Sequence, residues 1–156
     1  MHVKTQGLVL RETNYKEADK ILTVLTREGG KRTVKARGCR RKNSPLAASA
    51  QLLAWSDMTL FAYRDRLTLN EAEALELFWG VRADVEKLAL ASYFAEVTEA
   101  VAEEGRPDPA LLSLALNSLY ALDKLQRPLP LVKAAFGLKL LFVGGYEPML
   151  DACVVC

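Results

Sequence analysis

Seven basic residues lie within twelve positions of the first half of the chain, and no acidic residue interrupts them. They are Lys31, Arg32, Lys35, Arg37, Arg40, Arg41 and Lys42. Clustered lysine and arginine side chains attract the phosphates of nucleic acids and release the counterions bound there. The alternative interpretation is a solvated basic loop that only keeps the protein soluble. The cluster predicts a polyanionic partner, and nucleic acid is the favoured one.

The charge of the chain is divided between its halves, although the formal net charge of the whole is only +2. Residues 1–70 contain 14 lysines and arginines against 6 aspartates and glutamates, a net charge of +8. Residues 71–156 contain 7 against 13, a net charge of −6. A division of this size predicts two units with different partners.

A second group with a chemical signature is the motif Cys153-Val-Val-Cys156. Two thiolates three residues apart form half of a tetrahedral zinc site. Because Cys39 and His2 are the only other candidate ligands, we expect a second ligand pair beyond residue 156 and interpret the chain as a fragment. We therefore expect zinc in the full-length protein and no tightly bound zinc in these 156 residues. A redox pair would open a helix after a buried strand, which is not the context of residues 146–152. Cysteines without a role are the third interpretation.

Catalytic constellations are missing from the sequence, so we expect a protein that is not an enzyme. One histidine at position 2 cannot anchor a serine or cysteine relay. The segment Gly29-Gly30-Lys31 lacks the spacing of a phosphate-binding loop, and a hairpin explains its glycines. Asp19 lies among apolar neighbours and is interpreted as a turn or hydrogen-bonding residue rather than a catalytic acid.

Aromatic side chains in the basic half are candidates for base stacking, which helps to hold single strands. They are Tyr15, Trp55, Phe61 and Tyr63. Trp55 and Phe61 alternate with leucines, which favours positions in the core. Tyr15 lies in a polar turn and is the better candidate for a stacking platform at the surface.

The elements that position these residues begin with five short runs typical of strands, bounded by polar turns. The runs cover residues 5–12, 19–27, 31–38, 51–63 and 66–72. Paired glycines at positions 29 and 30 predict a hairpin turn, and residues 38–49 read as a loop. Period-two alternation places Lys35 and Arg37 on the face opposite Val34 and Ala36. Five strands without room for crossover helices predict a small antiparallel barrel of the OB type.

Helical patterns follow from Glu71, and Glu71, Glu73 and Glu76 are interpreted as the acidic start of a helix. One apolar stripe at helical spacing consists of Leu90, Tyr93, Phe94, Val97 and Val101. Residues 110–125 are apolar nearly all round, which predicts the buried member of a bundle. A further helix is expected from about Pro130 to Gly144-Gly145.

These patterns together predict a two-domain α+β protein. A basic OB-fold domain covers residues 1–78, an acidic α-helical domain covers residues 79–152, and residues 153–156 form the first half of a zinc module. The longest apolar stretch is too short and too charged to span a membrane. Three cysteines without a signal peptide favour the reducing cytoplasm.

Several of these motifs, in this order, resemble the family of the bacterial DNA repair protein RecO. The similarity spans essentially the whole chain, and the combination is specific although no single piece is. It is carried by residues 5–26, the glycine turn, residues 35–44, residues 81–89, residues 134–148 and the terminal cysteine pair.

The resemblance implies an OB domain, a helical domain and, in many members, a four-cysteine zinc module. It implies binding to single- and double-stranded DNA, annealing of complementary strands, and work in the cytoplasm at the nucleoid. RecR, single-strand-binding protein and, indirectly, RecA are the implied protein partners. The DNA contacts implied by the resemblance are Lys35, Arg37, Arg40, Arg41 and Lys42, while Lys31 and Arg32 are added on charge alone.

Two alternatives from other classes remain open. In the first, the chain is an adaptor whose barrel docks the acidic tail of single-strand-binding protein. In the second, the barrel binds RNA. Binding measured against single-stranded DNA, duplex DNA, RNA and an acidic peptide at several salt concentrations separates these readings.

Overall fold

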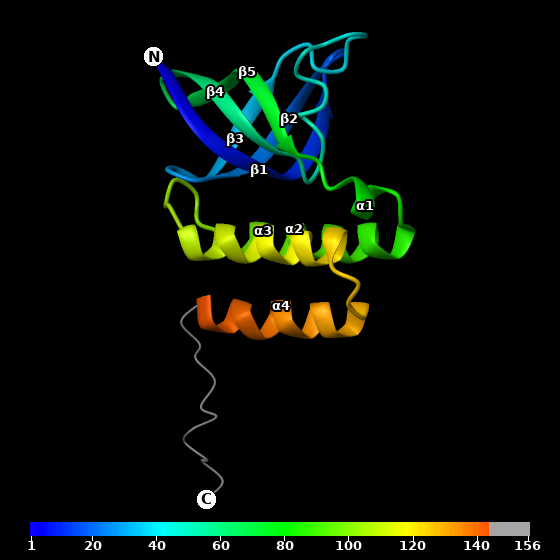
Figure 1. Cartoon of the computed structure of the whole chain (residues 1–156). Coiled ribbons are helices and arrows are strands. Elements are labelled where there is room, and N and C mark those ends of the chain that lie inside the picture. Colours follow the sequence, from blue (N-terminus) through cyan, green and yellow to red (C-terminus); the bar gives the residue numbers. More distant parts are fainter. Residues whose placement is uncertain (144–156) are drawn as a thin grey trace, which may run out of the picture.

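The computed structural model describes residues 1–143, and its first half is a barrel of five strands (Figure 1). The strands are β1 His2–Tyr15, β2 Asp19–Thr26, β3 Gly30–Ala36, β4 Trp55–Tyr63 and β5 Arg66–Glu76. They close in the order β1-β2-β3-β5-β4. All five expected strands are present, and the OB-type barrel is confirmed.

One strand pairing departs from the antiparallel expectation. β3 and β5 run parallel, with Val34 opposite Leu67 and Lys35 opposite Thr68. The other four pairings are antiparallel. Directions cannot alternate all the way around a closed ring of five strands, so one neighbouring pair must be parallel. Closure in this way leaves no open sheet edge.

The interior of the barrel is filled by alternate residues of its strands. One buried cluster contains Val9, Leu22, Val24, Val34, Met58 and Leu60. The connection between β3 and β4, residues 37–54, adds Cys39, Leu46, Ala50 and Ala54 to the same cluster. The loop expected over residues 38–49 is present and extends to residue 54, because β4 begins at Trp55 rather than near residue 51. The connection packs onto the barrel, and Cys39 is a buried core residue.

The acidic segment after residue 70 is strand, so its interpretation as a helix start is wrong. Glu71, Glu73 and Glu76 belong to β5, which pairs with β4 up to Trp55 opposite Glu76. Glu71 and Glu73 alternate with half-buried alanines and point to solvent. Glutamate and alanine favour helices in isolation, but pairing with a neighbouring strand overrides that preference here.

In the described part of the chain, four helices follow the barrel. They are α1 Trp79–Arg82, α2 Val85–Val101, α3 Pro109–Lys124 and α4 Leu129–Val143. Asp84 caps α2 by accepting hydrogen bonds from the backbone N–H groups of Glu86 and Lys87. Asp108 caps α3 through the N–H of Leu111, with Pro109 in the first turn. In residues 1–143, no helix combines the length and apolar character needed to cross a membrane.

The apolar faces of the helices follow the sequence pattern unevenly. α3 is the buried member of the bundle, as expected, with Leu111, Leu112 and Leu119 almost fully enclosed. The stripe expected on α2 is displaced, because its buried face contains Ala91, Phe94, Ala95 and Thr98 while Tyr93 and Val101 are exposed. The expected end of α4 at Gly144-Gly145 and the pair Cys153 and Cys156 lie outside the described residues.

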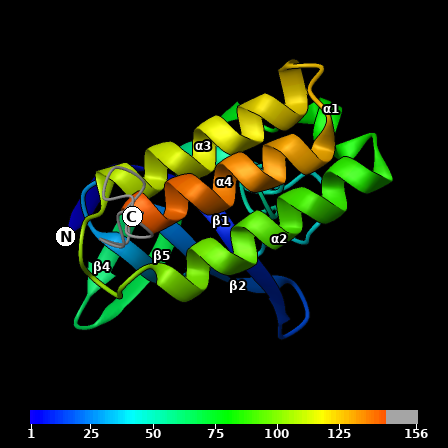
Figure 2. The same cartoon turned by 90° about the horizontal axis from the view of Figure 1, so that it is seen from below.

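Barrel and helices share one apolar core. Leu8, Leu10 and Leu25 of the strands belong to the same buried cluster as Phe94 and Phe136 of the helices. The two phenylalanine rings stack with centroids 4.1 Å apart. Figures 1 and 2 show α2 and α3 as a layer beneath the barrel, with α4 on the far side of that layer. The start of β3 lies near the helical layer, where Lys31 pairs with Glu104 in a β-bridge. The end of β3 lies on the opposite side of the barrel, which the described helices do not cover, and we call that side the free end of the barrel.

Candidate nucleic-acid interface

The free end of the barrel joins the β1–β2 turn to the start of the β3–β4 connection. Backbone N–H groups of Gly38 and Arg40 donate hydrogen bonds to the Asp19 carboxylate at 2.7 Å and to the carbonyl of Ala18 at 2.9 Å. The Arg40 guanidinium donates to the carbonyl of Lys16 at 3.4 Å. The hydrogen-bonding role expected for Asp19 is thereby confirmed.

We call the exposed cations of this free end the basic tip. They are Lys16, Arg37, Arg40, Arg41 and Lys42, all exposed. Gly38 turns the chain between them with a φ of +67°, a conformation that a side chain disfavours. Four of the five come from the sequence cluster, while Lys16 comes from the neighbouring turn. Sequence reasoning missed Lys16 because it lies fifteen positions before the cluster, and only the β1–β2 hairpin brings it there.

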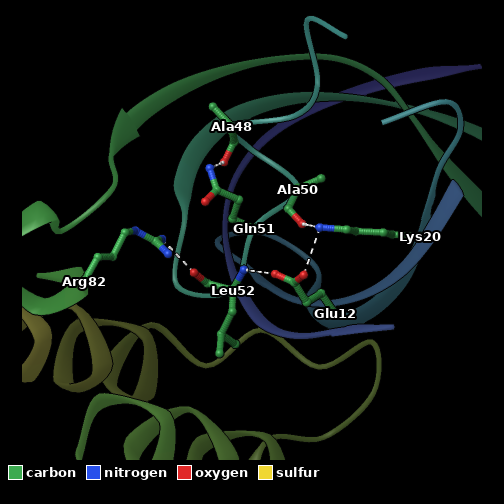
Figure 3. A network of polar contacts seen from close by, with 7 residues as sticks. All are labelled: Glu12, Lys20, Ala48, Ala50, Gln51, Leu52 and Arg82. Atoms are coloured by element: carbon green, nitrogen blue, oxygen red, sulfur yellow. Dashed lines mark hydrogen bonds and ion pairs between the residues drawn. The ribbon is translucent and has the colours of Figure 1, made fainter. Parts of the chain in front are cut away.

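A polar network pins the other end of the same connection (Figure 3). The Lys20 ammonium contacts the Glu12 carboxylate at 2.8 Å, and that carboxylate also accepts a hydrogen bond from the N–H of Leu52. Arg82 of α1 donates to the carbonyls of Leu52 and Leu77, each at 2.6 Å. Burial lowers the pKa of the Arg82 guanidinium, an effect that the nearby Glu12 opposes. The segment that carries the basic tip is thus fastened at both ends.

Lys31 and Arg32, at the opposite end of β3, face the helical domain. The Lys31 ammonium donates to the carbonyl of Glu99 at 3.0 Å, and the Lys31 carbonyl accepts from the N–H of Gly105, also at 3.0 Å. Arg32 lies 3.9 Å from the carboxylate of Glu104. Both side chains are half-buried. The structure therefore divides the sequence cluster and brings only its later members to the basic tip.

Tyr15 and Lys35 form a pair on the outside of the barrel. The Lys35 ammonium lies 5.1 Å from the centre of the Tyr15 ring, and the Lys16 ammonium lies 5.3 Å from it. Tyr15 is 40% exposed. An exposed aromatic ring with two cations near it can stack on a base while the cations meet the adjoining phosphates. Lys35 thus extends the basic tip along β3.

The two aromatic residues expected in the core behave differently from each other. Trp55 is half-buried, packs against the shared core and lies 5.6 Å from the Arg27 guanidinium. Phe61 is 38% exposed on the outside of the barrel, so the core interpretation is wrong for this residue. Side chains alternate along β4, and the preceding residue, Leu60, is the one that points into the barrel.

The sulfur and imidazole candidates for a metal site do not come together. Burial raises the pKa of the Cys39 thiol, so this residue stays protonated at neutral pH. His2 packs edge-on against Phe61 with ring centroids 5.3 Å apart. Among residues 1–143, no group of three or more histidine, cysteine, aspartate or glutamate side chains could hold a metal ion. Cys153 and Cys156 lie outside that range.

Comparisons with known proteins match the whole length of the chain. The family model described as "Recombination protein O N terminal" matches residues 1–78. The model described as "Recombination protein O C terminal" matches residues 82–156. The first of these ends where β5 gives way to the helices.

Similar curated proteins carry the name "DNA repair protein RecO". Relatives from Acetivibrio thermocellus and Alkaliphilus metalliredigens are 39% and 38% identical over 99% and 100% of this chain. The relative from Symbiobacterium thermophilum is 40% identical over 96%. The chain spans 62%, 63% and 59% of the length of these three relatives. Both domain matches and the relatives agree, and the chain belongs to the RecO family.

Proposed function

We propose that this chain is a non-enzymatic DNA-binding unit that works in DNA repair and recombination. The observation that carries the proposal is the basic tip, in which four exposed cations lie on a segment fastened at both ends and a fifth, Lys16, lies on the neighbouring β1–β2 turn. A surface fixed in this way loses little conformational freedom when it binds a polyanion. The name of the relatives, "DNA repair protein RecO", supports DNA as the polyanion.

The proposed DNA contacts are a subset of the basic residues. They are Lys16, Lys35, Arg37, Arg40, Arg41 and Lys42. Lys31 and Arg32 are left out because their side chains engage the helical domain. Contacts of this kind bind phosphates without reading sequence, so single- and double-stranded DNA are both ligands.

Strand annealing is the proposed activity. Two complementary strands repel each other through their phosphates, and a shared cationic surface neutralises part of that charge. Base pairing then selects the correct partner without help from the protein. No covalent bond is made or broken in this scheme, and no ATP is consumed. RecR, single-strand-binding protein and RecA are proposed as the protein partners, and the cytoplasm as the location.

Zinc binding by Cys153 and Cys156 stays a prediction, since both residues lie outside the described part of the chain. The adaptor function, in which the basic tip holds an acidic peptide, and RNA binding are the alternatives. The same cations serve all three ligands, so only competition between ligands can rank them.

The test is a salt titration of binding to single-stranded DNA, duplex DNA, RNA and an acidic peptide. We expect both DNAs to bind and to release counterions, with a slope of log affinity against log salt of about −2 to −3.5 on single strands for about 3–5 contacts. A fluorescence-quenching assay with complementary oligonucleotides then measures annealing, which should be inhibited by salt and independent of ATP. Binding of the peptide alone would replace the DNA function by the adaptor function.

A further inference from the structure

One row of cross-strand partners runs around the outside of the barrel, and it connects the Tyr15–Lys35 pair to a second aromatic surface. The consecutive partners are Thr13, Ile21, Lys35, Thr68, Phe61 and His2. Side chains of directly paired residues lie on the same face of a sheet. Phe61 therefore faces outward with Lys35, two strand spacings or about 10 Å away.

The second aromatic surface includes the tip of the β4–β5 hairpin. Tyr63 is two residues beyond Phe61 on the same strand, so it shares the outward face. The Tyr63 side chain is 59% exposed and pairs across the hairpin with Arg66. The Arg64 guanidinium lies 5.3 Å from the centre of its ring. The Tyr63 ring thus has Arg64 beside it, as Tyr15 has Lys16 and Lys35, and Phe61 is exposed two residues away on the same strand.

Acidic residues bound this aromatic surface on its other side. Farther along the same two strands, Asp57 pairs with Glu73, and Glu71 pairs with Thr59. These three carboxylates and that of Glu28 line a hollow of about 500 Å³, where they outnumber one lysine, Lys4. Carboxylates in this hollow repel the phosphates of DNA. A DNA strand that passes from Lys35 across β5 is therefore directed toward Arg64 and Arg66 and not along the length of β4.

We propose that Phe61 and Tyr63 form a second base-stacking platform for single-stranded DNA, flanked by Arg64 and Arg66. The strand enters at the basic tip, passes Tyr15 and Lys35, crosses β5 at Thr68 and ends on the β4–β5 hairpin. Aromatic rings accept every base, so the platform adds affinity for unpaired strands without sequence preference. This inference rests on the proposed DNA binding and assigns it a direction across the barrel.

The test compares Tyr63→Ala, Tyr63→Phe and Tyr120→Ala in the 156-residue chain. Tyr120 is a matched control, because it is 51% exposed on α3, away from the barrel. The probe is an oligothymidylate of about 16 nucleotides, long enough for the site of one OB fold. Tyr63→Ala should weaken binding by at least about fivefold, the low end of the loss of one stacked base. Tyr63→Phe and Tyr120→Ala should bind like the unchanged protein.

An abasic strand of the same length separates stacking from charge. Tyr63→Ala should bind this strand as the unchanged protein does, and its salt dependence should not change, since no phosphate contact is removed. Equal affinities of Tyr63→Ala and the unchanged protein for oligothymidylate would overturn the inference, as would an equal loss on the abasic strand. If Arg40→Gln with Arg41→Gln weakens binding and Tyr63→Ala does not, the proposed function stands and the platform fails. No binding of single strands by the unchanged protein would overturn both.

Discussion

The two ends of β3 carry similar basic residues but hold them in different surroundings. At the first end, Lys31 donates to the carbonyl of Glu99 in α2, and Arg32 lies near the carboxylate of Glu104, between α2 and α3. At the other end, Arg37 and Arg40 extend from a fastened turn into solvent. The same residue types therefore hold two domains together at one end and are free for a ligand at the other. Tertiary contacts, which a count of charges does not contain, decide the difference.

The first way to test this comparison is to disturb the end that joins the domains. Gly30 has a φ of +67°, and a Cβ built there would lie 2.1 Å from the carbonyl oxygen of Arg106. Gly30→Ala should cost about 3 kcal/mol of unfolding free energy, from the left-handed backbone and the forced shift of Arg106 together. Urea denaturation measures this cost.

Gly105→Ala is the matched control for that variant. Gly105 has a φ of +74°, but nothing lies within 4 Å of the Cβ position. Its cost should be about 1 kcal/mol, from the backbone conformation alone. Equal losses for the two variants would show that the glycine turn does not press against the helical domain.

A second variant removes a fastening of the connection that carries the basic tip. Arg82→Met keeps much of the apolar stem but loses both hydrogen bonds, to Leu52 and to Leu77. Unfolding free energy should fall by about 2 kcal/mol, because a charged donor is lost and buried carbonyls stay unpaired. An unchanged urea midpoint would mean that water replaces the guanidinium at no cost.

The smallest expected effect is a change in DNA affinity on replacing Asp19. It is informative because the loss of a negative charge and the loss of a hydrogen bond change the affinity in opposite directions. Asp19→Ala removes an acidic residue from the basic end, which on charge alone should strengthen DNA binding. It also removes the acceptor that holds the N–H of Gly38. The lost hydrogen bond contributes about 1 kcal/mol to the fixed turn, or about fivefold in affinity, and the lost negative charge offsets part of that loss. We therefore expect affinity for single-stranded DNA to fall by about threefold.

Asp65→Ala is the control for the loss of charge. Asp65 is exposed in the β4–β5 hairpin, and its side chain has no hydrogen bond or ion pair among the described residues. This variant should bind single-stranded DNA slightly more tightly. A rise in affinity for Asp19→Ala as well would show that the basic tip acts through its net charge and not through its fixed geometry.

Local patterns predicted most of the barrel. Apolar alternation located all five strands, and the glycine pair located the β2–β3 turn. The segment from Glu71 to Glu76 was wrongly predicted as a helix start, because glutamate and alanine favour helices. Its strand partner on β4 lies more than ten positions away, so no local pattern indicates the pairing. Phe61 misled for a related reason, since a chain of alternating apolar residues does not say which face is the inner one when both faces carry large side chains.

The sequence predicted that the candidate site is basic, but it did not predict which basic residues belong to the site. The cluster of basic residues is visible in the sequence, whereas the partner of Lys31 is the carbonyl of Glu99, 68 positions away. No periodic pattern reports a contact at that separation. Lys16 and Tyr63 are likewise brought to their surroundings by strand pairing rather than by sequence neighbours.

The most direct test of the central claim removes the same two charges from each end of β3. Lys31→Gln with Arg32→Gln is compared with Arg40→Gln with Arg41→Gln, and the slope of log affinity against log salt is measured on single-stranded DNA. We predict that only the Arg40 and Arg41 changes weaken binding, and that they move the slope toward zero by about 1.4, the value for two phosphate contacts on a single strand. Equal losses of affinity and of slope in the two double variants would contradict the division of the cluster.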